Sequence, residues 1–410
     1  MNWLNLILAK IRKLSLSISR SLGRRFSSGC VNIHDFRKAS RWFLPKPIYG
    51  YLDGGADDEI TLANNNQDFA HYELLPRYLV DISSIDLATN VMGCDISFPL
   101  VLSPTGMSRL FHPDGELAVV KAAEKAGLIY SLSTLSTYSI EEVAAVSDVP
   151  KWFQIYVFKD RNLITEFFER CRKSGFVGMT LTIDVPPQGN REKDVRYGLT
   201  IPPKINLARV LDYSLTPFWS INYLLGEKFE LANVSHRAPV GNTDLMTLIN
   251  YLHDQFDFSV SWEDAEEMIK LWGGPFAIKG ISSVSDAKRA VEVGASTLIL
   301  SNHGGRQLDS AVTPIGLLPE VRRAVGEGVE LILDGGIRRG TDIFKALALG
   351  ANACSVGRPY LYGLATNGET GVSQALNILK AEFERTMGLM GITSIRDINR
   401  GCLRRRKVIE

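Results

Sequence analysis

A histidine and an arginine three residues apart, His303 and Arg306, carry the clearest chemistry in this sequence. They follow a short apolar run, residues 297–300, and the turn between them contains Gly304 and Gly305. An apolar run this short that ends at a glycine turn is typical of a buried strand. Histidine takes up a proton near neutral pH, and arginine binds a carboxylate through two parallel hydrogen bonds. The pair therefore indicates an enzyme that removes a proton or a hydride from a carbon next to a carboxylate.

A second interpretation of this stretch is a loop in which both side chains cap the next helix or pair with a surface acid. The rest of the chain argues against it, because apolar runs of strand length recur from residue 98 onward, separated by amphipathic stretches of helical spacing. Such alternation predicts an α/β fold of the parallel (β/α)8 TIM-barrel type, in which catalytic groups lie at the carboxyl ends of the strands. The runs are 98–102, 128–132, 152–157, 178–183, 276–279, 297–300, 330–333 and 353–356.

Polar residues follow every one of these predicted strands. Glycine-rich loops after the seventh and eighth strands of a barrel usually bind phosphate, and here Arg338 and Arg358 add positive charge. No GxGxxG follows the first strand, so a mononucleotide is favoured over a dinucleotide. Lys279 can stabilise negative charge on a reduced ring. The strand-end residues are Thr105, Gly106, Ser133, Gln154, Tyr156, Thr182, Asp184, Lys279, Ser301, His303, the loop 334–340, Gly357 and Arg358.

Composition excludes several other classes of protein. The chain has 410 residues, 45% of them hydrophobic and 22% charged, and a formal net charge of +1. A balanced charge argues against a nucleic-acid binder, and the length suits one barrel with extensions. The cysteines are scattered without ligand spacing, so we expect reduced thiols and neither a disulfide framework nor a metal site.

The first 34 residues differ from the rest and are left out of the fold prediction. They contain no Asp or Glu, but several Lys, Arg and Ser, and their apolar residues recur at helical spacing. A basic amphipathic helix of this kind can lie on an anionic membrane, and its apolar part is shorter than the ~20 residues that span one. Mitochondrial targeting segments look similar, and residues 24–27 resemble a processing site. A disordered leader without a role is a third possibility.

One connection is much longer than a βα unit needs, since an insert of about residues 190–260 separates the fourth and fifth strands. Its part at 211–225 is aromatic and apolar, so it needs a partner: a lid over the site, another subunit or lipid. Residues 226–260 are polar, and we expect loops there. The predicted organisation is a leader at 1–34, a barrel domain at 35–400 and a basic tail at 401–410.

The chain resembles the FMN-dependent 2-hydroxy-acid dehydrogenases and oxidases, which include L-lactate dehydrogenase, mandelate dehydrogenase and glycolate oxidase. The likeness covers residues 35 to about 400 and looks closest to the membrane-associated mandelate and lactate branch. The long insert and the stretches RPYLYGLATNGETGV and ALALGA favour that branch. The matching motifs are SNHGGRQLD at 301–309, YGYLDGGA, SPTGM, WFQIYV, LTIDVP, FAIKG, DGGIRRGTD and VGRP.

The resemblance implies a role for each site residue. His303 is the base that takes the α-proton, or the hydroxyl proton if a hydride leaves, and Asp184 orients it and stabilises the imidazolium. The substrate carboxylate and oxygens are bound by Arg191, Arg306, Tyr51 and Tyr156. FMN is held by Thr105, Gly106, Ser133, Gln154, Thr182, Lys279, Ser301, Asp334, Gly335, Gly336, Arg338, Gly357 and Arg358.

The implied reaction is oxidation of an L-2-hydroxy acid, for which we expect L-lactate, to the 2-oxo acid. The residues before the barrel are too few for a haem domain, so we expect an external quinone or cytochrome to take the electrons. A mandelate-type dehydrogenase for bulkier acids and an oxygen-using oxidase remain alternatives. A flavin-binding protein or FMN isomerase is a further rival, against which the carboxylate clamp of Arg191 and Arg306 argues.

Pocket size, location and assembly complete the expectations. Gly106 stands where many lactate and glycolate enzymes have alanine, and Leu135 is smaller than the tryptophan of glycolate oxidase. Both changes enlarge the pocket, but one methyl group alters selectivity by only ~1–3 kcal/mol. We expect a homotetramer at the cytoplasmic face of a bacterial inner membrane, or alternatively in the mitochondrion.

Overall fold

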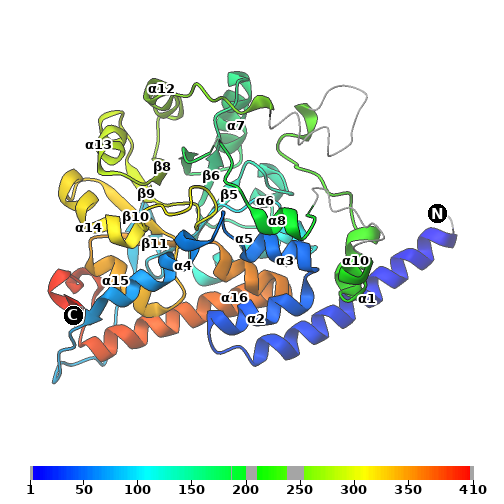
Figure 1. The fold of residues 1–410 in the computed structure, drawn as a ribbon, viewed down its shortest axis with the longest axis horizontal. Coiled ribbons are helices and arrows are strands. Elements are labelled where there is room, and N and C mark those ends of the chain that lie inside the picture. Colours follow the sequence, from blue (N-terminus) through cyan, green and yellow to red (C-terminus); the bar gives the residue numbers. More distant parts are fainter. Residues whose placement is uncertain (1–2, 186, 200–209, 238–253, 407–410) are drawn as a thin grey trace.

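A closed barrel of eight parallel strands forms the centre of the computed structural model, which describes residues 3–185, 187–199, 210–237 and 254–406 (Figure 1). The last strand pairs with the first and closes the ring. This confirms the predicted (β/α)8 fold, and each predicted apolar run overlaps one strand. In chain order the strands are β4 (Leu100–Leu102), β5 (Ile129–Ser133), β6 (Lys151–Ile155), β7 (Gly178–Thr182), β8 (Phe276–Ile281), β9 (Thr297–Leu300), β10 (Glu330–Asp334) and β11 (Ala353–Val356).

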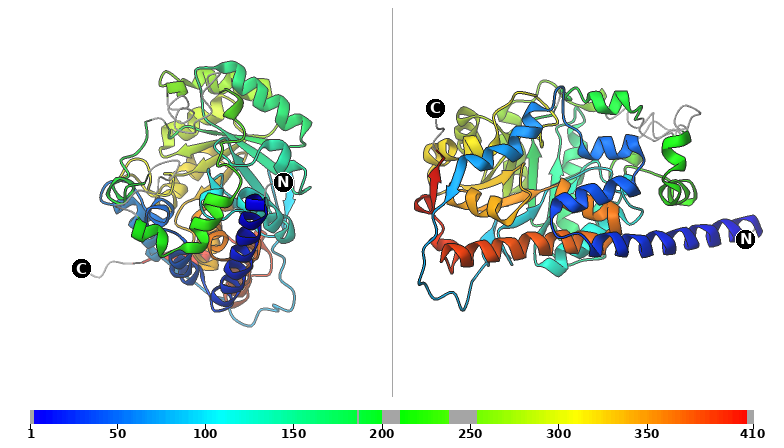
Figure 2. Two further views of the ribbon diagram at one scale, coloured as in Figure 1. Left: turned by 90° about the vertical axis from the view of Figure 1, so that its right-hand side faces the viewer. Right: turned by 60° about the horizontal axis from the view of Figure 1, so that its bottom comes forward.

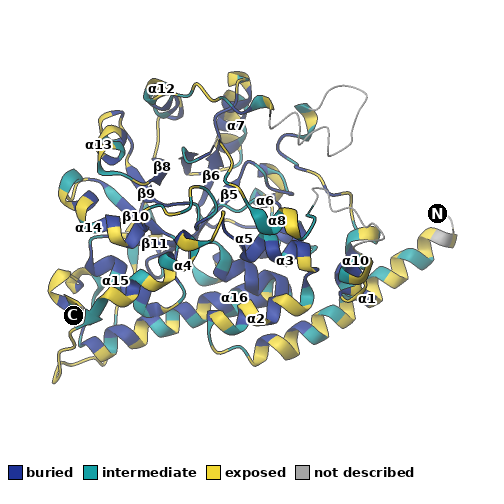
Figure 3. Cartoon of the chain, in the orientation of Figure 1, coloured by how far each residue is buried: buried dark blue, intermediate teal, exposed yellow. Residues whose placement is uncertain are grey.

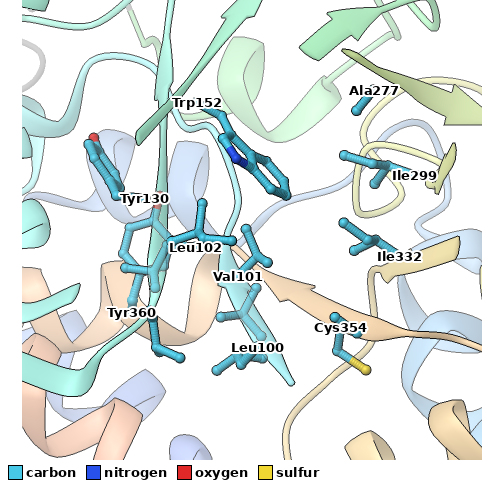
Figure 4. Close-up of a cluster of buried hydrophobic side chains, with 14 of the residues drawn as sticks. Leu100, Val101, Leu102, Tyr130, Trp152, Ala277, Ile299, Ile332, Cys354 and Tyr360 are labelled. Atoms are coloured by element: carbon cyan, nitrogen blue, oxygen red, sulfur yellow. The ribbon is translucent and has the colours of Figure 1, made fainter. Parts of the chain in front are cut away.

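The strands are apolar on both faces because the interior and the surrounding helices bury them from both sides. Figure 4 shows Val101, Trp152, Ile299 and Ile332 pointing toward one another inside the barrel. None of these side chains is more than 3% exposed. The amino-terminal half of each strand therefore supplies the core, and the carboxyl end is left to carry polar groups.

Helices cover the outside of the barrel and follow its strands in the expected order (Figure 1). The last of them, α16, is bent where Asn367 and Gly368 leave the helical conformation. The covering helices are α5 (Gly115–Ala126), α6 (Ile140–Ala144), α7 (Arg161–Lys173), α12 (Trp262–Trp272), α13 (Val284–Glu292), α14 (Pro314–Val325), α15 (Gly340–Ala348) and α16 (Arg358–Met390).

An N-terminal extension packs against this body. Its long first helix, α1, confirms the helix expected in the leader and runs beside α16 (Figure 2). The chain then crosses to the barrel mouth, where α3 ends. The elements of the extension are α1 (Trp3–Ser28), α2 (Ile33–Phe43), α3 (Lys46–Asp53), α4 (Ile60–Gln67), η1 (Asp68–His71) and the hairpin β2 (Thr89–Val91) and β3 (Cys94–Ile96). The short turn η2 (Ser108–Leu110) belongs to the loop after β4.

The predicted boundary of the basic tail at residue 401 needs correction. Strand β12 (Leu403–Arg405) pairs antiparallel with β1 (Tyr72–Leu74) near the other end of the chain. It follows two short helical turns, η5 (Ile395–Asp397) and η6 (Arg400–Cys402). The sequence of residues 403–405 is basic, yet backbone pairing with a distant strand makes it part of the folded domain.

The insert contains short helices, of which α10 lies beside α1 (Figure 1). They are α8 (Glu192–Arg196), α9 (Val210–Ser214), α10 (Pro217–Leu225) and η4 (Ser235–Arg237). Trp219 of α10 stacks on Tyr223 at 4.9 Å, and its Nε1 donates to the Leu110 carbonyl at 2.7 Å. The aromatic segment thus finds a partner in the loop after β4, and α10 also contacts α1. Much of the loop predicted at 226–260 lies outside the described residues.

Candidate active site

A cavity of about 400 Å³ opens at the carboxyl ends of the barrel strands. Its walls come from six of the strand-end loops, from α3 and from the insert. The fold therefore brings together side chains as far apart in sequence as Tyr51 and Leu361. The predicted residues that line the cavity are Tyr51, Thr105, Gly106, Ser133, Tyr156, Arg191, Lys279, His303, Arg306, Asp334, Gly335, Gly336, Arg338, Gly357 and Arg358.

Four predicted residues lie behind this lining and contact it. Asp184 bonds to His303, and Ser301 accepts a hydrogen bond from Lys279 Nζ at 3.0 Å. Gln154 Oε1 accepts from the Ser133 hydroxyl at 3.1 Å. Thr182 is buried and pairs with Lys279 in the register of β7 and β8. These four residues hold the side chains that line the cavity in place.

The imidazole of His303 is held by Asp184. His303 Nδ1 lies 3.2 Å from Asp184 Oδ1 and 3.3 Å from Oδ2. Burial raises the pKa of the Asp184 carboxyl, but the charge and hydrogen bond of His303 outweigh burial and hold that pKa below its usual range. An ionised carboxylate at Nδ1 fixes the proton on that nitrogen and leaves Nε2 as the proton acceptor. The pair has the arrangement that a general base requires.

A strained turn and a glycine make this contact possible. His303 has a φ of 57°, a left-handed conformation that is uncommon for a side chain larger than glycine. Asp184 follows β7 and His303 follows β9, so the bond between them crosses the end of β8. There Gly280 has a φ of 106°, and a Cβ on it would lie 2.9 Å from the Cβ of Asp184. The register of β8 and β9 also shifts at this point.

Two guanidinium groups gather beside Tyr51. The Arg306 guanidinium lies 4.7 Å from the centre of the Tyr51 ring, and that of Arg191 lies 5.5 Å from it. Arg306 also donates to the carbonyls of Tyr51 at 2.6 Å and Gly54 at 3.1 Å. Burial and the nearby charge of Arg191 lower the pKa of Arg306 to about 10. An anion between these two cations would relieve their repulsion, and a carboxylate has the geometry to accept from both.

A buried ion pair forms the floor of the site. Lys279 Nζ lies 3.1 Å from Asp334 Oδ2. Hydroxyl groups of Ser103, Ser301 and Ser355 also donate to Asp334, at 2.5, 2.7 and 2.8 Å. Burial raises the pKa of Asp334, but Lys279 and the three hydroxyls outweigh it and lower that pKa to about 2. Burial lowers the pKa of Lys279, but Asp334 and Asp184 raise it above its usual value, so the ammonium stays charged.

The glycine turn that follows β10 has the features of a phosphate-binding site. Gly335 and Gly336 have φ values of 117° and 82°, and a Cβ on Gly336 would lie 1.9 Å from the Asn65 carbonyl oxygen. Arg338 and Arg358 line the cavity together with this glycine turn. Among the described residues, both guanidinium groups donate to backbone carbonyls, which do not neutralise their charge. Two such cations and a glycine turn suit a phosphate.

A buried amide group suits the ring end of a flavin. Gln154 Nε2 has no hydrogen-bond partner among the described residues, although the side chain is 1% exposed. A buried donor without a partner costs about 1–3 kcal/mol, so a ligand with an acceptor group there would stabilise it. The donor set therefore fits FMN, which carries both a phosphate and a ring with hydrogen-bond acceptors.

Several lining residues were not predicted from the sequence. Leu231 and Phe256 come from the insert, and Met107 and Phe111 from the loop after β4. Phe256 packs edge-on against Tyr156 with 5.5 Å between ring centres. Only the fold brings these apolar side chains to the mouth. For Gly280, the FAIKG motif was noted, but the spacing gave no sign that Asp184 lies against it.

Comparison with known proteins identifies the class of enzyme. Residues 40–405 match the family of FMN-dependent dehydrogenases, and the chain belongs to this family. It is accordingly an FMN flavoprotein that oxidises 2-hydroxy acids.

Relatives in this family carry names with different substrates. Glycolate oxidase 3 of Arabidopsis thaliana is 40% identical over 370 residues, which are 90% of this chain and 95% of that protein. "Putative L-lactate dehydrogenase" of Mycobacterium tuberculosis is 39% identical over 92% of this chain and 89% of its own length. The crystal structure of the monotopic membrane protein (S)-mandelate dehydrogenase aligns with a TM-score of 0.88 and 38% identity, over 92% of this chain and all of that one.

The floor of the site generates a prediction about stability. Asp334→Asn keeps the shape of the side chain but leaves the Lys279 cation buried without its partner, so we expect a loss of about 3–5 kcal/mol in the free energy of unfolding at neutral pH. Because the pKa of Asp334 is depressed in the folded state, its contribution is complete above pH 3.8 and is lost as the pH falls through about 2. Urea unfolding over a pH series measures the difference.

The matched control is the exposed Asp58→Asn, which should leave stability unchanged. An Asp334→Asn variant as stable as this control at neutral pH would contradict the assigned ion pair. A difference that stays constant down to pH 2 would contradict its pH dependence.

Proposed function

We propose that the protein is an L-2-hydroxy-acid dehydrogenase that oxidises L-lactate to the 2-oxo acid and passes electrons to a quinone or cytochrome. The observation that supports this is the presence of the His303–Asp184 pair and the guanidinium groups of Arg191 and Arg306 around one cavity. A base and a carboxylate clamp in one site suit a substrate that carries its reacting hydrogen next to a carboxylate. An FMN isomerase has no need for such a clamp.

In the proposed reaction, Arg306 and Arg191 bind the substrate carboxylate and Tyr51 and Tyr156 its oxygens. Burial, and next the charge of Asp184, raise the pKa of Tyr156, so its hydroxyl stays protonated and donates. His303 Nε2 takes a proton from the substrate, and Asp184 stabilises the resulting imidazolium.

The cofactor accepts electrons, and the residues of this chain hold the cofactor in place. FMN, when bound, supplies the acceptor for the two electrons that leave the substrate carbon. The charged Lys279 stabilises negative charge at the ring, and the Lys279–Asp334 bond fixes the ammonium. The residues that we propose to hold FMN are Thr105, Gly106, Ser133, Gln154, Thr182, Lys279, Ser301, Asp334, Gly335, Gly336, Arg338, Gly357 and Arg358.

The substrate side chain is the least constrained part of this proposal. FMN and the acid share one cavity of about 400 Å³, into which Leu231 and Phe256 project from the insert, and a small acid such as L-lactate suits the remaining space. Gly106 favours the alternative of a bulkier, mandelate-type acid, because a Cβ there would lie 3.1 Å from Leu135. The identity with glycolate oxidases favours the second alternative, an oxygen-using oxidase.

We also propose a membrane-surface location, at the cytoplasmic face of a bacterial inner membrane or, as the alternative, in the mitochondrion. The likeness to a monotopic membrane protein supports it. Among the described helices, none has both the length and the apolar character needed to cross a bilayer. The protein would act as a homotetramer, for which Tyr78 and Leu79, 79% and 107% exposed, offer apolar contact surface.

The function is tested by anaerobic mixing of the yellow holoenzyme with L-lactate, D-lactate, glycolate and both mandelate enantiomers. We expect L-lactate to bleach the flavin fastest and D-lactate to leave it oxidised. Reoxidation by a soluble quinone should be faster than by oxygen. If (S)-mandelate bleached the flavin fastest, the substrate would be the bulkier acid and not L-lactate. Rapid peroxide formation in air would show that the enzyme is an oxidase and not a dehydrogenase.

Substitution of the base tests the proposed chemistry. His303→Gln should retain FMN but reduce the rate of flavin reduction by about 10²–10⁴-fold, since removal of a general base costs that much. Stopped-flow absorbance of the flavin measures it. The exposed His34→Gln is the control and should reduce flavin at the wild-type rate. Near-normal reduction in His303→Gln would show that another group takes the proton.

A further inference from the structure

Helix α1 meets the rest of the protein through its small and polar residues. Ser15 and Ser27 are 4% and 2% exposed. A Cβ on Gly23 would lie 2.5 Å from the Thr366 carbonyl oxygen of α16, and Asn367 Nδ2 donates to the Ser27 hydroxyl at 3.0 Å. Close backbone approach thus holds α1 on the bend of α16.

Five apolar residues of α1 lie on a different face of the helix. Trp3, Ile7, Ile11, Leu14 and Ile18 recur every three or four residues and so share one face of the helix, here called the outward stripe. The exposed fractions of Trp3, Ile11, Leu14 and Ile18 are 75%, 42%, 62% and 40%. Figure 3 shows that the N-terminal half of α1 is largely exposed and extends past the body of the protein. An amphipathic helix that packs on a core would present the opposite face to solvent.

Neighbouring helices of the insert add exposed leucines. Helix α10 packs against α1, as Figures 1 and 2 show. Leu211 and Leu215 in and after α9, and Leu224 in α10, are 70%, 71% and 63% exposed. Trp219 fixes α10 on the loop after β4, so these leucines are presented by an anchored segment. Two elements distant in sequence therefore expose apolar side chains at one end of the molecule.

Positive charge accompanies the outward stripe. The first 34 residues contain no acid, and Lys10, Lys13 and Arg24 lie along one flank of the stripe at 100° per residue. A cleft of about 520 Å³ between α1 and α10 is lined by Arg12 and Lys13 together with leucines. Arg12 Nε is buried and has no hydrogen-bond partner among the described residues. An anionic group in this cleft would supply the missing acceptor.

We propose that the outward stripe of α1 lies within the headgroup layer of an anionic bilayer, with the helix parallel to the surface. Lipid phosphates then contact Lys10 and Lys13 on the flank of the stripe, and the exposed leucines of α9 and α10 reach the bilayer at the same end of the molecule. This inference rests on the proposed membrane location and assigns it to a surface. A second copy of the chain is a poorer occupant, because two acid-free basic helices repel each other.

The test is flotation of the full-length holoenzyme with vesicles of phosphatidylcholine, alone or mixed with phosphatidylglycerol. The wild type should float with the mixed vesicles and bind the neutral ones much less. Leu14→Gln combined with Ile18→Gln should lower the partition coefficient at least about tenfold, because two buried aliphatic side chains are lost. The matched control is Leu389→Gln, which changes a leucine that is 68% exposed elsewhere, on α16.

A charge variant separates the two parts of the surface. Lys13→Gln should weaken binding to mixed vesicles at low salt but not at high salt, whereas the exposed Lys288→Gln should do neither. Flotation of Leu14→Gln/Ile18→Gln at the wild-type level would overturn the assignment to α1. A change in its sedimentation without a change in flotation would also overturn it and point to a second copy. Flavin reduction by substrate, unchanged in these variants, keeps this outcome distinct from failure of the proposed enzyme activity.

Discussion

The contact between His303 and Asp184 is the constraint around which the site is built. It joins the ends of β7 and β9 across β8, so the strand between them must leave room. Gly280 and the shift in register beside it provide that room, and the left-handed turn at His303 brings the ring back over the barrel. A side chain at position 280 would separate the base from its carboxylate. The chemistry thus depends on a backbone irregularity in the middle of an otherwise regular barrel.

Around this contact, negative groups lie in the floor of the cavity and positive groups lie in its walls. The buried carboxylates of Asp184 and Asp334 lie below the cavity, and each is held by a cation or imidazole. The guanidinium groups of Arg191, Arg306, Arg338 and Arg358 line the same cavity. Anions that enter the cavity therefore meet several positive charges.

Much of this arrangement follows from the sequence, for physical reasons. Barrel strands are buried on both faces, so each appears as a short apolar run, and their carboxyl ends meet at one edge. Residues such as Lys279 and His303 could therefore be placed together without coordinates. The apolar lining from the insert, Leu231 and Phe256, could not, because its position depends on how a long loop folds back. Strand β12 was missed for a related reason, since its partner is β1, far away in sequence.

Helix α1 shows a further limit of sequence patterns. Its periodicity predicted an amphipathic helix, but a period does not say which face meets the protein. The small residues Gly23 and Ser27 determine which face of α1 packs on the protein, because they fit against the bend of α16.

In the proposed mechanism, His303 assists cleavage of the bond between C2 of a hydroxy acid and its hydrogen. The most direct test compares anaerobic flavin reduction by L-lactate with that by L-lactate carrying deuterium at C2. The account predicts severalfold slower bleaching with deuterium, and no bleaching by the D-enantiomer. Equal rates with the two isotopes, in a step shown to be flavin reduction itself, would contradict it, as would a flavin that no 2-hydroxy acid bleaches.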